Sequence, residues 1–514
     1  MHDSDVRMVG WSPWSGAQLI AAARTGTPIE ELPGDFTVAE DGPGETYIVS
    51  SLLACRPYYW TQDAVGAVVH GDDLFAVAQQ AGLPWRWDDD AVRTLALMRH
   101  LVGEQTLHRD IRRMPAGAIL HRHAGIVTMT RADPLTAALD GPRDTDERAV
   151  QQLLDALAEM PGDPLLTLTA GMDSRLLLAA LLHLGRRPML WTAGPEHGSD
   201  RRVATAIARA TGLEHHVVEL DSADFLRHGA AITRRTGGGY LAGDWHSYLL
   251  LGGAAATGAP IALKGANGEL ARSFYADAGL AARTADHGPG ALAGARLALT
   301  VRRGRARHAD PIRVLDPLRG GDTAAWLPDR LAATCSAPRR PLARLDHFYA
   351  LQRVRRFVGT GLHLAAATMP VASPFLDARW ALAAARLPRD RKLGDAFHRA
   401  AIGRLAPELL RHPTATASRM RVTAPPGAWL RSAPPDMSYS PFDTVVTSAA
   451  AGEIVRDSPW LDRFADPAER AAIALSNDRW ATELLLTLHF AGEHAAAVDA
   501  AKPPVTIGIP QLSA

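Results

Sequence analysis

The fold of this chain is decided by the stretch Leu165-Leu-Thr-Leu-Thr-Ala-Gly-Met-Asp-Ser-Arg-Leu-Leu-Leu-Ala-Ala180. It reads as a short apolar strand, a turn that contains Gly171, and an amphipathic helix that we expect to begin at Ser174. The Thr169 hydroxyl and the backbone N–H groups of the turn are expected at the positive end of that helix, where pyrophosphate can bind without a lysine. Asp173 adds a carboxylate that can share a Mg²⁺ with the phosphates. A buried strand, a tight turn and a core helix explain the same pattern without a ligand.

Length and charge exclude several classes of protein. The chain has 514 residues and 47% hydrophobic content, enough for two or three domains with sizeable cores. Lys+Arg and Asp+Glu are both 55, so the net charge is zero and nucleic acid is not an expected partner. We find no signal-peptide region and no apolar run of membrane-spanning length, so we expect a cytoplasmic protein without a membrane partner.

Cysteine and lysine are both rare. The two cysteines, Cys55 and Cys335, lie far apart in sequence, which argues against a zinc ribbon, an iron–sulfur cluster or a disulfide scaffold. They are expected to be core residues or inert surface thiols. The three lysines are Lys264, Lys392 and Lys502, and this scarcity narrows the search for a catalytic lysine.

Three domains are expected. Short β-like runs such as 45–53, separated by turn signals, predict an α+β domain over residues 1–145. The polar segment 140–146 contains Gly-Pro and reads as a linker. An α/β domain with a doubly wound parallel sheet is expected over 146–435, and a C-terminal helical extension over 436–514.

Alternating strands and helices support the parallel sheet. A strand at 188–194 is followed by a helix at Ser199–Thr211 and a strand at 215–220. Ligands bind such sheets at the carboxyl ends of the strands. The residues expected to face an adenine there, mostly through backbone, are Trp191, Thr192 and Gly194. A buried strand end explains them almost as well.

The segment 261–270 carries a second candidate group. Its sequence Ile-Ala-Leu-Lys-Gly-Ala-Asn-Gly-Glu-Leu is an apolar strand followed by Gly265 and Gly268, which bracket an asparagine, and then by Glu269. Glu269 is the best candidate for a second Mg²⁺ contact opposite Asp173. Lys264 could reach a phosphate. The alternative is a surface turn in which Glu269 is solvated and the lysine at the strand end extends its ammonium group into solvent.

These motifs resemble those of a known family. The stretch Thr169-Ala-Gly-Met-Asp-Ser174 resembles the Ser-Gly-Gly-x-Asp-Ser pyrophosphate loop of ATP pyrophosphatases, and its surroundings resemble the synthetase domain of class B asparagine synthetases. Thr169 keeps the hydroxyl of the serine, and Ala170 in place of the first glycine implies a negative φ. Segment 261–270 is similar to the Gly-x-Gly-x-Asp-Glu loop, one residue shorter and with a single acid. Met369–Asp377 resembles the Arg-x-Pro-Phe-Leu-Asp signature, so the resemblance covers roughly residues 150–430.

The resemblance implies ATP and Mg²⁺ as cofactors and assigns the site residues. Asp173 and Glu269 would hold the metal, and Asp173, Glu269 and Lys264 would act in catalysis. The residues expected to cradle the nucleotide are Thr169, Ala170, Gly171, Met172, Asp173, Ser174, Trp191, Thr192, Gly194, Gly265 and Gly268.

The N-terminal domain resembles the same relatives without their glutaminase chemistry. Residues 103–120 are similar to the end of the amidotransferase domain, where a Pro-Ala-Gly turn precedes a strand. Glutamine-dependent members use an N-terminal cysteine, whereas this chain begins Met1-His2 and Cys55 lies deep in the sequence. We therefore expect a glutaminase-like domain that serves only as a scaffold.

The family chemistry implies an activity. In these relatives ATP activates a carboxylate as an acyl-adenylate, pyrophosphate leaves, and an amine attacks to give an amide and AMP. Without delivered ammonia, the chain looks most similar to lasso peptide macrolactam cyclases, which join a peptide's N-terminal amine to an Asp or Glu side chain. The expected partners are a precursor peptide, a leader-peptide-binding protein and a leader protease. A β-lactam- or asparagine-forming ligase and a non-catalytic adenylate-binding scaffold are the alternatives.

Four assignments stay open. The stretch 412–421, where relatives carry a lysine that stabilises developing charge, has none, and only Arg419 or Arg421 could supply the charge. The general base is unassigned. Candidates for lining the acceptor pocket are Tyr240, His246 and Tyr275. Candidates for binding a carboxylate or phosphate, unless they form a solvated basic helix face, are Arg353, Arg355 and Arg356.

Overall fold

The computed structural model describes residues 5–196, 198–220, 222–275, 323–334, 337–414, 448–476 and 478–501.

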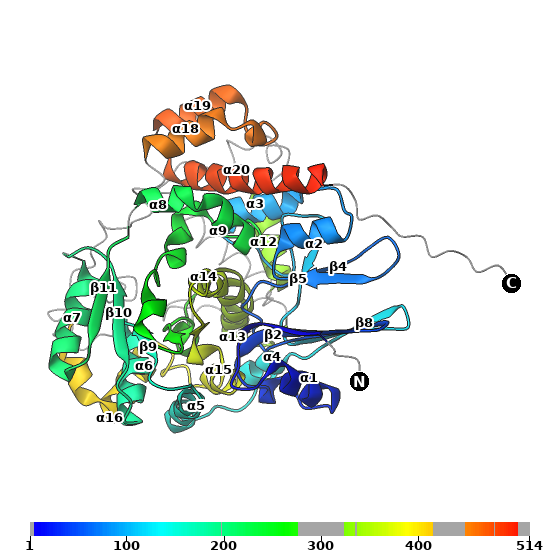
Figure 1. Ribbon diagram of the computed structural model, residues 1–514. Helices are drawn as coiled ribbons and strands as arrows, with labels where there is room; N and C mark the ends of the chain where they lie inside the picture. Colours follow the sequence, from blue (N-terminus) through cyan, green and yellow to red (C-terminus); the bar gives the residue numbers. More distant parts are fainter. Residues whose placement is uncertain are drawn as a thin grey trace.

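The N-terminal part contains a five-stranded antiparallel sheet. The sheet has the strand order β1-β2-β3-β7-β8, and all neighbours are antiparallel. Helix α1 (Gly16–Arg24) packs on one face of it (Figure 1). The strands are β1 Asp5–Trp11, β2 Asp35–Gly42, β3 Glu45–Ser50, β7 Ala118–His123 and β8 Ile126–Arg131.

A smaller sheet with two helices completes this α+β arrangement. Its strands follow the order β5-β4-β6, and α2 packs against β4 and β5. The Pro-Ala-Gly turn at 115–117 leads directly into β7, as the sequence predicted. The elements are β4 Tyr59–Gln62, β5 Val68–Gly71, α2 Leu74–Gln80, α3 Asp89–Met98 and β6 Arg112–Arg113.

The parallel sheet that the sequence predicted is present, and it has five strands in the order β11-β10-β9-β12-β13. The chain builds outward from β9 through β10 to β11, and β12 and β13 are then added on the other side of β9. The direction of strand addition therefore reverses between β9 and β12, the position where ligands bind open α/β sheets. The strands are β9 Leu165–Thr167, β10 Met189–Ala193, β11 His215–Val218, β12 Ala262–Leu263 and β13 Val371–Ala372.

Helices surround this sheet. Helix α7 (Ser199–Thr211) has the bounds that the sequence predicted. Helix α6 (Met172–His183) does not begin at Ser174, because Gly171 has extended backbone angles, φ −72° and ψ 161°, and serves as the N-cap. The other helical elements of this region are α4 Pro134–Asp140, α5 Asp146–Ala158, α8 Ser222–Arg227, α9 Gly229–Thr236, η2 Ala242–Tyr248, η4 Gly268–Ala271, α12 Thr323–Thr334, α13 Pro341–Phe348, η7 Tyr349–Val358, α14 Gly359–Ala365, α15 Ala378–Ala385 and α16 Ala396–Leu405.

The C-terminal helices share a hydrophobic core with the N-terminal part. Helix α20 (Arg479–Ala500) lies across α2, α9 and η2, and α18 (Ala449–Asp457) and α19 (Pro467–Ser476) pack beside it (Figure 1). The fully buried Glu483 of α20 pairs with Arg99 at 2.5 Å, and Arg99 pairs with Asp244 of η2 at 2.9 Å. These ion pairs fix η2 against α20. The proposed domain borders remain predictions, and the one at 435/436 lies outside the described residues. Among the described helices, none has the length and apolar content needed to cross a membrane.

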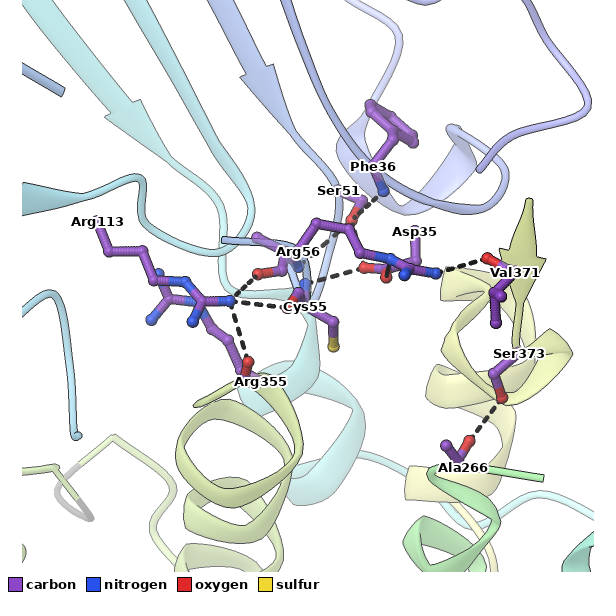
Figure 2. A network of polar contacts seen from close by, with 11 residues as sticks. Asp35, Phe36, Ser51, Cys55, Arg56, Arg113, Ala266, Arg355, Val371 and Ser373 are labelled. Carbon is purple, nitrogen blue, oxygen red and sulfur yellow. Dashed lines mark hydrogen bonds and ion pairs between the residues drawn. The ribbon is translucent and has the colours of Figure 1, made fainter. Parts of the chain in front are cut away.

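A buried network joins the antiparallel sheet to the parallel sheet. Arg56 pairs with Asp35 at 3.2 Å and donates to the carbonyl of Val371 in β13 at 2.7 Å (Figure 2). Cys55 N–H donates to the same Asp35 carboxylate at 2.9 Å. Burial raises the pKa of the Cys55 thiol well above its usual value, which confirms the expectation of an inert core cysteine. Cys335 lies outside the described residues.

Arg355 and Arg356 have a structural role. This role differs from both expectations for them, which were binding a carboxylate or phosphate and forming a solvated basic helix face. Both are buried in η7 and donate to N-terminal backbone carbonyls, Arg355 to Gly103 at 2.9 Å and Arg356 to Gln105 at 2.7 Å. Arg113 extends this contact to Cys55 and Arg355 carbonyls (Figure 2). Neither Arg355 nor Arg356 is available to a carboxylate or phosphate, and neither forms a solvated face.

Asp377, the last residue of the Pro-Phe-Leu-Asp motif, is a structural clasp. One carboxylate oxygen accepts from Arg379 N–H at 3.0 Å and so caps α15, while the other accepts from Gly34 N–H at 3.1 Å. The Arg379 guanidinium pairs with Asp377 at 2.9 Å and with Glu159 at 2.7 Å. The motif therefore ties α15 to both α5 and the N-terminal part.

We predict that Asp377→Ala lowers the free energy of unfolding by about 1–2 kcal/mol, because it removes a helix cap and leaves Gly34 N–H without its acceptor. Urea unfolding followed by tryptophan fluorescence measures the change. The control is Asp457→Ala, which removes an exposed carboxylate whose ion pair among the described residues is with its neighbour Arg456, and it should change stability by less than about 0.5 kcal/mol. Equal effects of the two substitutions would contradict the clasp.

Candidate active site

The loop after β9 presents hydroxyls and amides at the start of α6. Thr169 N–H donates to Ser174 Oγ at 3.1 Å, the two hydroxyls lie 3.1 Å apart, and Gly171 N–H donates to Thr169 Oγ1 at 3.1 Å. Gly171 has no side chain to cap α6, and no other described side chain caps this helix N-terminus. The first-turn N–H groups therefore remain available to an anion, which the helix dipole also favours.

Ala170 fits the loop without strain. The described non-glycine residues with positive φ are Ala54, Arg99, Ala124 and Asn267, so the φ of Ala170 is negative, as expected. Its N–H donates to Asp200 Oδ1 at 2.8 Å. Burial raises the pKa of Asp200, and the Ala170 N–H partly offsets this effect. The backbone of residue 170 is thus anchored to the first turn of α7.

Two glycines allow the loop after β12 to lie directly on α6. A Cβ at Gly265 would come within 2.6 Å of Ser174 N, and a Cβ at Gly268 would come within 2.2 Å of Asp173 Oδ1. Between them, Asn267 has φ 76° and donates its side-chain amide to the Phe375 carbonyl at 2.7 Å. This contact brings the two predicted metal ligands, Asp173 and Glu269, to the same end of α6.

The two carboxylates have opposite pKa shifts. Burial raises the pKa of Asp173, but Arg272 at 2.6 Å and His398 at 2.7 Å outweigh it, so the net shift is downward. For Glu269, burial and the nearby charge of Asp173 raise the pKa, although Arg272 and a hydrogen bond from the Tyr349 hydroxyl act in the other direction. Asp173 is held as the anion, whereas Glu269 carries the cost of a second negative charge beside it.

The arrangement fits a divalent cation. Oε2 of Glu269 is buried and has no hydrogen-bond partner among the described residues. A cation bound between Glu269 and Asp173 would satisfy this oxygen and relieve the repulsion between the two charges. Carboxylate oxygens are the ligands that Mg²⁺ prefers, and phosphate oxygens would complete its shell.

A cavity of about 360 Å³ opens at the carboxyl ends of β9, β10 and β11. Its volume lies within the usual range for small-molecule sites. Of the predicted site residues, those that line it are Thr169, Trp191, Thr192, Gly194 and Lys264. Those that lie beside it, in the loop and α6 N-terminus or the loop after β12, are Ala170, Gly171, Met172, Asp173, Ser174, Gly265, Gly268 and Glu269. The structure thus places the predicted residues in two adjoining groups, and their roles remain predictions.

Trp191 and Thr192 use their side chains within the fold. The Trp191 indole N–H donates to the Leu250 carbonyl at 2.8 Å, and its ring stacks on His216 with centroids 5.6 Å apart. Thr192 Oγ1 donates to the Leu168 carbonyl at 2.8 Å. These contacts fix the strand end that forms one wall of the cavity.

Lys264 and His246 also line the cavity. Burial and the charge of Arg56 lower the pKa of Lys264 to about 8. Burial and the charge of Lys264 lower the pKa of His246 to about 4. At neutral pH the lysine is therefore the positive group of this cavity wall and the histidine is neutral. Both residues line the cavity, and the place of His246 in an acceptor pocket remains a prediction.

The other acceptor-pocket candidates do not line the cavity. Tyr240 is buried, and its hydroxyl bonds to Ser247. Tyr275 packs edge-on against Phe348 and Tyr349.

Arg353, a candidate for binding a carboxylate or phosphate, lies over the rings of Phe274 and Phe357 at 5.3 and 4.7 Å. Arg419 and Arg421 lie outside the described residues.

Sequence reasoning missed several site residues. Asp200 could have been found, because the first turn of the helix after β10 must lie at the same sheet edge as the loop after β9. Arg272 follows Glu269 within one turn. His398 and Asp395, which contact Asp173 and Arg272, come from α16 and its N-cap, far along the chain, and no local pattern marks them.

The fold is an α/β domain with a five-stranded parallel sheet, and the candidate site lies at the topological switch point of that sheet. A model of the asparagine synthase family matches residues 163–490, more than half of the chain. The chain therefore belongs to the asparagine synthase family, whose members are ATP-dependent amide-forming ligases. No curated protein matches the chain.

We predict that the amine of Lys264 titrates with a midpoint near pH 8. Reductive ¹³C-methylation labels few lysines, and the signal lost in Lys264→Arg identifies the resonance to follow by NMR. Because the folded-state pKa is depressed, the unfolded chain binds more protons between about pH 8 and the usual lysine pKa. Wild-type stability should therefore rise with pH in that window relative to Lys264→Met. A midpoint near the usual lysine value would show that the amine is solvated.

We predict that Gly268→Ala weakens MgATP binding by roughly tenfold or more, because the new methyl group displaces the Asp173 carboxylate. Isothermal titration calorimetry measures the change. Gly42→Ala is the matched control, since a Cβ there meets nothing within 4 Å and its φ is not positive. Unchanged binding by Gly268→Ala would rule out the tight contact between the two loops.

Proposed function

We propose that this protein is an ATP- and Mg²⁺-dependent ligase that converts a carboxylate into an acyl-adenylate and joins it to an amine, with release of AMP and pyrophosphate. The substrate that we propose is a precursor peptide, whose N-terminal amine is joined to an Asp or Glu side chain as in lasso peptide cyclases. The observation that carries the proposal is the uncapped N-terminus of α6 beside Asp173 and Glu269 at the switch point of the parallel sheet.

Each group has a role in this proposal. The α6 amides and the hydroxyls of Thr169 and Ser174 hold the leaving pyrophosphate. Asp173 and Glu269 hold Mg²⁺, which neutralises phosphate charge. Lys264, positive at neutral pH, faces the same cavity and offsets charge that develops around the α-phosphate. Most of the rate comes from positioning and electrostatic stabilisation rather than from a protein nucleophile.

Two observations support an amine that arrives with the substrate. Cys55 is fully buried and its thiol pKa is raised, so it is not a nucleophile for releasing ammonia from glutamine. An aromatic group that includes Phe274, Tyr275 and Tyr349 adjoins Glu269 through the Tyr349 hydroxyl. Rings of this kind suit the side chains of a peptide. A leader-binding protein and a leader protease are the partners that a precursor peptide would require.

A small substrate is the second candidate. The cavity of about 360 Å³ is modest, and a nucleotide would occupy much of it. A β-lactam- or asparagine-forming ligase would share the adenylation step and accept an amino acid in the remaining space. The two candidates differ in the product rather than in AMP release.

The test is mass spectrometry of a reaction that contains the protein, MgATP and a linear core peptide. AMP with loss of one water from the peptide is the expected result. AMP only with small amino acids would favour the second candidate, and nucleotide binding without AMP from any substrate would leave a non-catalytic scaffold.

We predict that Asp173→Asn lowers AMP formation by roughly a hundredfold or more while the protein stays folded, because the amide cannot supply the second negative charge for the metal. The matched control is Asp163→Asn, an exposed carboxylate 3.8 Å from Arg186, which should keep full activity. Circular dichroism checks the fold of both variants. AMP formation at the wild-type rate by Asp173→Asn would refute its role as metal ligand.

A further inference from the structure

A second group of metal-ligand side chains lies on the antiparallel sheet. Glu45 of β3 lies directly opposite His123 of β7. His121 lies two residues before His123 on the same strand. Side chains two residues apart on a strand point to the same face, so both imidazoles share the face of Glu45. This sheet does not carry the candidate active site, which lies on the parallel sheet.

The three side chains converge closely enough to share one ion. One ligand atom from each of Glu45, His121 and His123 lies within 4.8 Å of the others, and His121 Nε2 is 2.8 Å from Glu45 Oε1. The two imidazole centroids are 5.8 Å apart. Two nitrogens and one carboxylate oxygen are the donors that Zn²⁺ and related transition metals prefer, and Mg²⁺ does not select imidazole.

Neighbouring residues orient the group. The Tyr47 ring packs edge-on against His121 with centroids 5.2 Å apart. Arg24, at the end of α1, lies 2.7 Å from Glu40 and 3.4 Å from Glu45. Because the shorter contact is to Glu40, Arg24 can keep this partner while Glu45 turns to a cation. His123 is exposed, so a metal can enter from solvent.

We propose that Glu45, His121 and His123 form a site for Zn²⁺, or for a divalent cation of the same ligand preference, that clamps β3 to β7. Three protein ligands leave a fourth tetrahedral position open to water. The site is separate from the proposed nucleotide site and does not depend on its activity.

Isothermal titration calorimetry of the full-length protein with Zn²⁺, in excess Mg²⁺ to occupy oxygen-only sites, tests the proposal. We expect one binding event that His123→Gln and Glu45→Gln each weaken by at least about tenfold. His123 is exposed, so His123→Gln should leave the fold intact, which circular dichroism checks.

His216→Gln is the matched control. Like His121, His216 is a partly exposed strand histidine with a glutamate at 2.8 Å, Glu214, but it belongs to no described group of three ligands. Loss of the event in His123→Gln but not in His216→Gln would support the site. Equal Zn²⁺ binding by wild type and His123→Gln, or no Zn²⁺ binding by the wild type, would overturn it.

Discussion

The contact between the loop after β12 and the N-terminus of α6 is the constraint on which the site depends. Without side chains at Gly265 and Gly268, that loop approaches until a methyl group would overlap Ser174 N or Asp173 Oδ1. The approach occurs at the point where strand order reverses, because β9 and β12 are adjacent but far apart in sequence. It places Glu269 beside Asp173, although no sequence motif contains both. The fold thus brings two acids and a helix N-terminus together through backbone proximity, to which the ion pair between Arg272 and Asp173 adds.

Charge is arranged around this contact in a way that suits a polyphosphate. Lys264 and the neutral His246 face the cavity, whereas Asp173 and Glu269 lie beside it at the start of α6. Arg272 and His398 lower the pKa of Asp173, whereas burial and the nearby charge of Asp173 raise the pKa of Glu269. A cation would relieve the repulsion between the two carboxylates and a phosphate would offset the charge of Lys264, so the two groups favour a metal–nucleotide complex over either part alone.

Local patterns predicted the elements of the fold, and long-range pairing supplied what they could not. Helix α7 has its predicted bounds, because its apolar period and the Gly212 C-cap are local signals. The sequence predicts that α6 starts at Ser174, because a serine is a stronger N-cap signal than a glycine, whereas Gly171 is the N-cap in the structure. His398 was missed since its partner Asp173 is far away in sequence. For Arg355 and Arg356 the sequence predicts either a bound anion or a solvated helix face. It shows that these residues are charged but not which backbone carbonyls surround them.

Those two arginines also explain why the N-terminal part accompanies the synthetase part. Burial and the charge of Arg113 lower the pKa of Arg355 to about 9 and the pKa of Arg356 well below its usual value, and the hydrogen-bond partners of both groups are backbone carbonyls. A buried guanidinium is tolerated only while its donors are bonded. The acceptors at Gly103 and Gln105 belong to the N-terminal part, and Arg56 reaches back to β13 in the same way (Figure 2). Removing the N-terminal part would leave the η7 cations without acceptors. Tyr349, which bonds to Glu269, lies in the same element η7. The N-terminal part therefore supports the site through hydrogen bonds. This structural role does not depend on glutaminase activity.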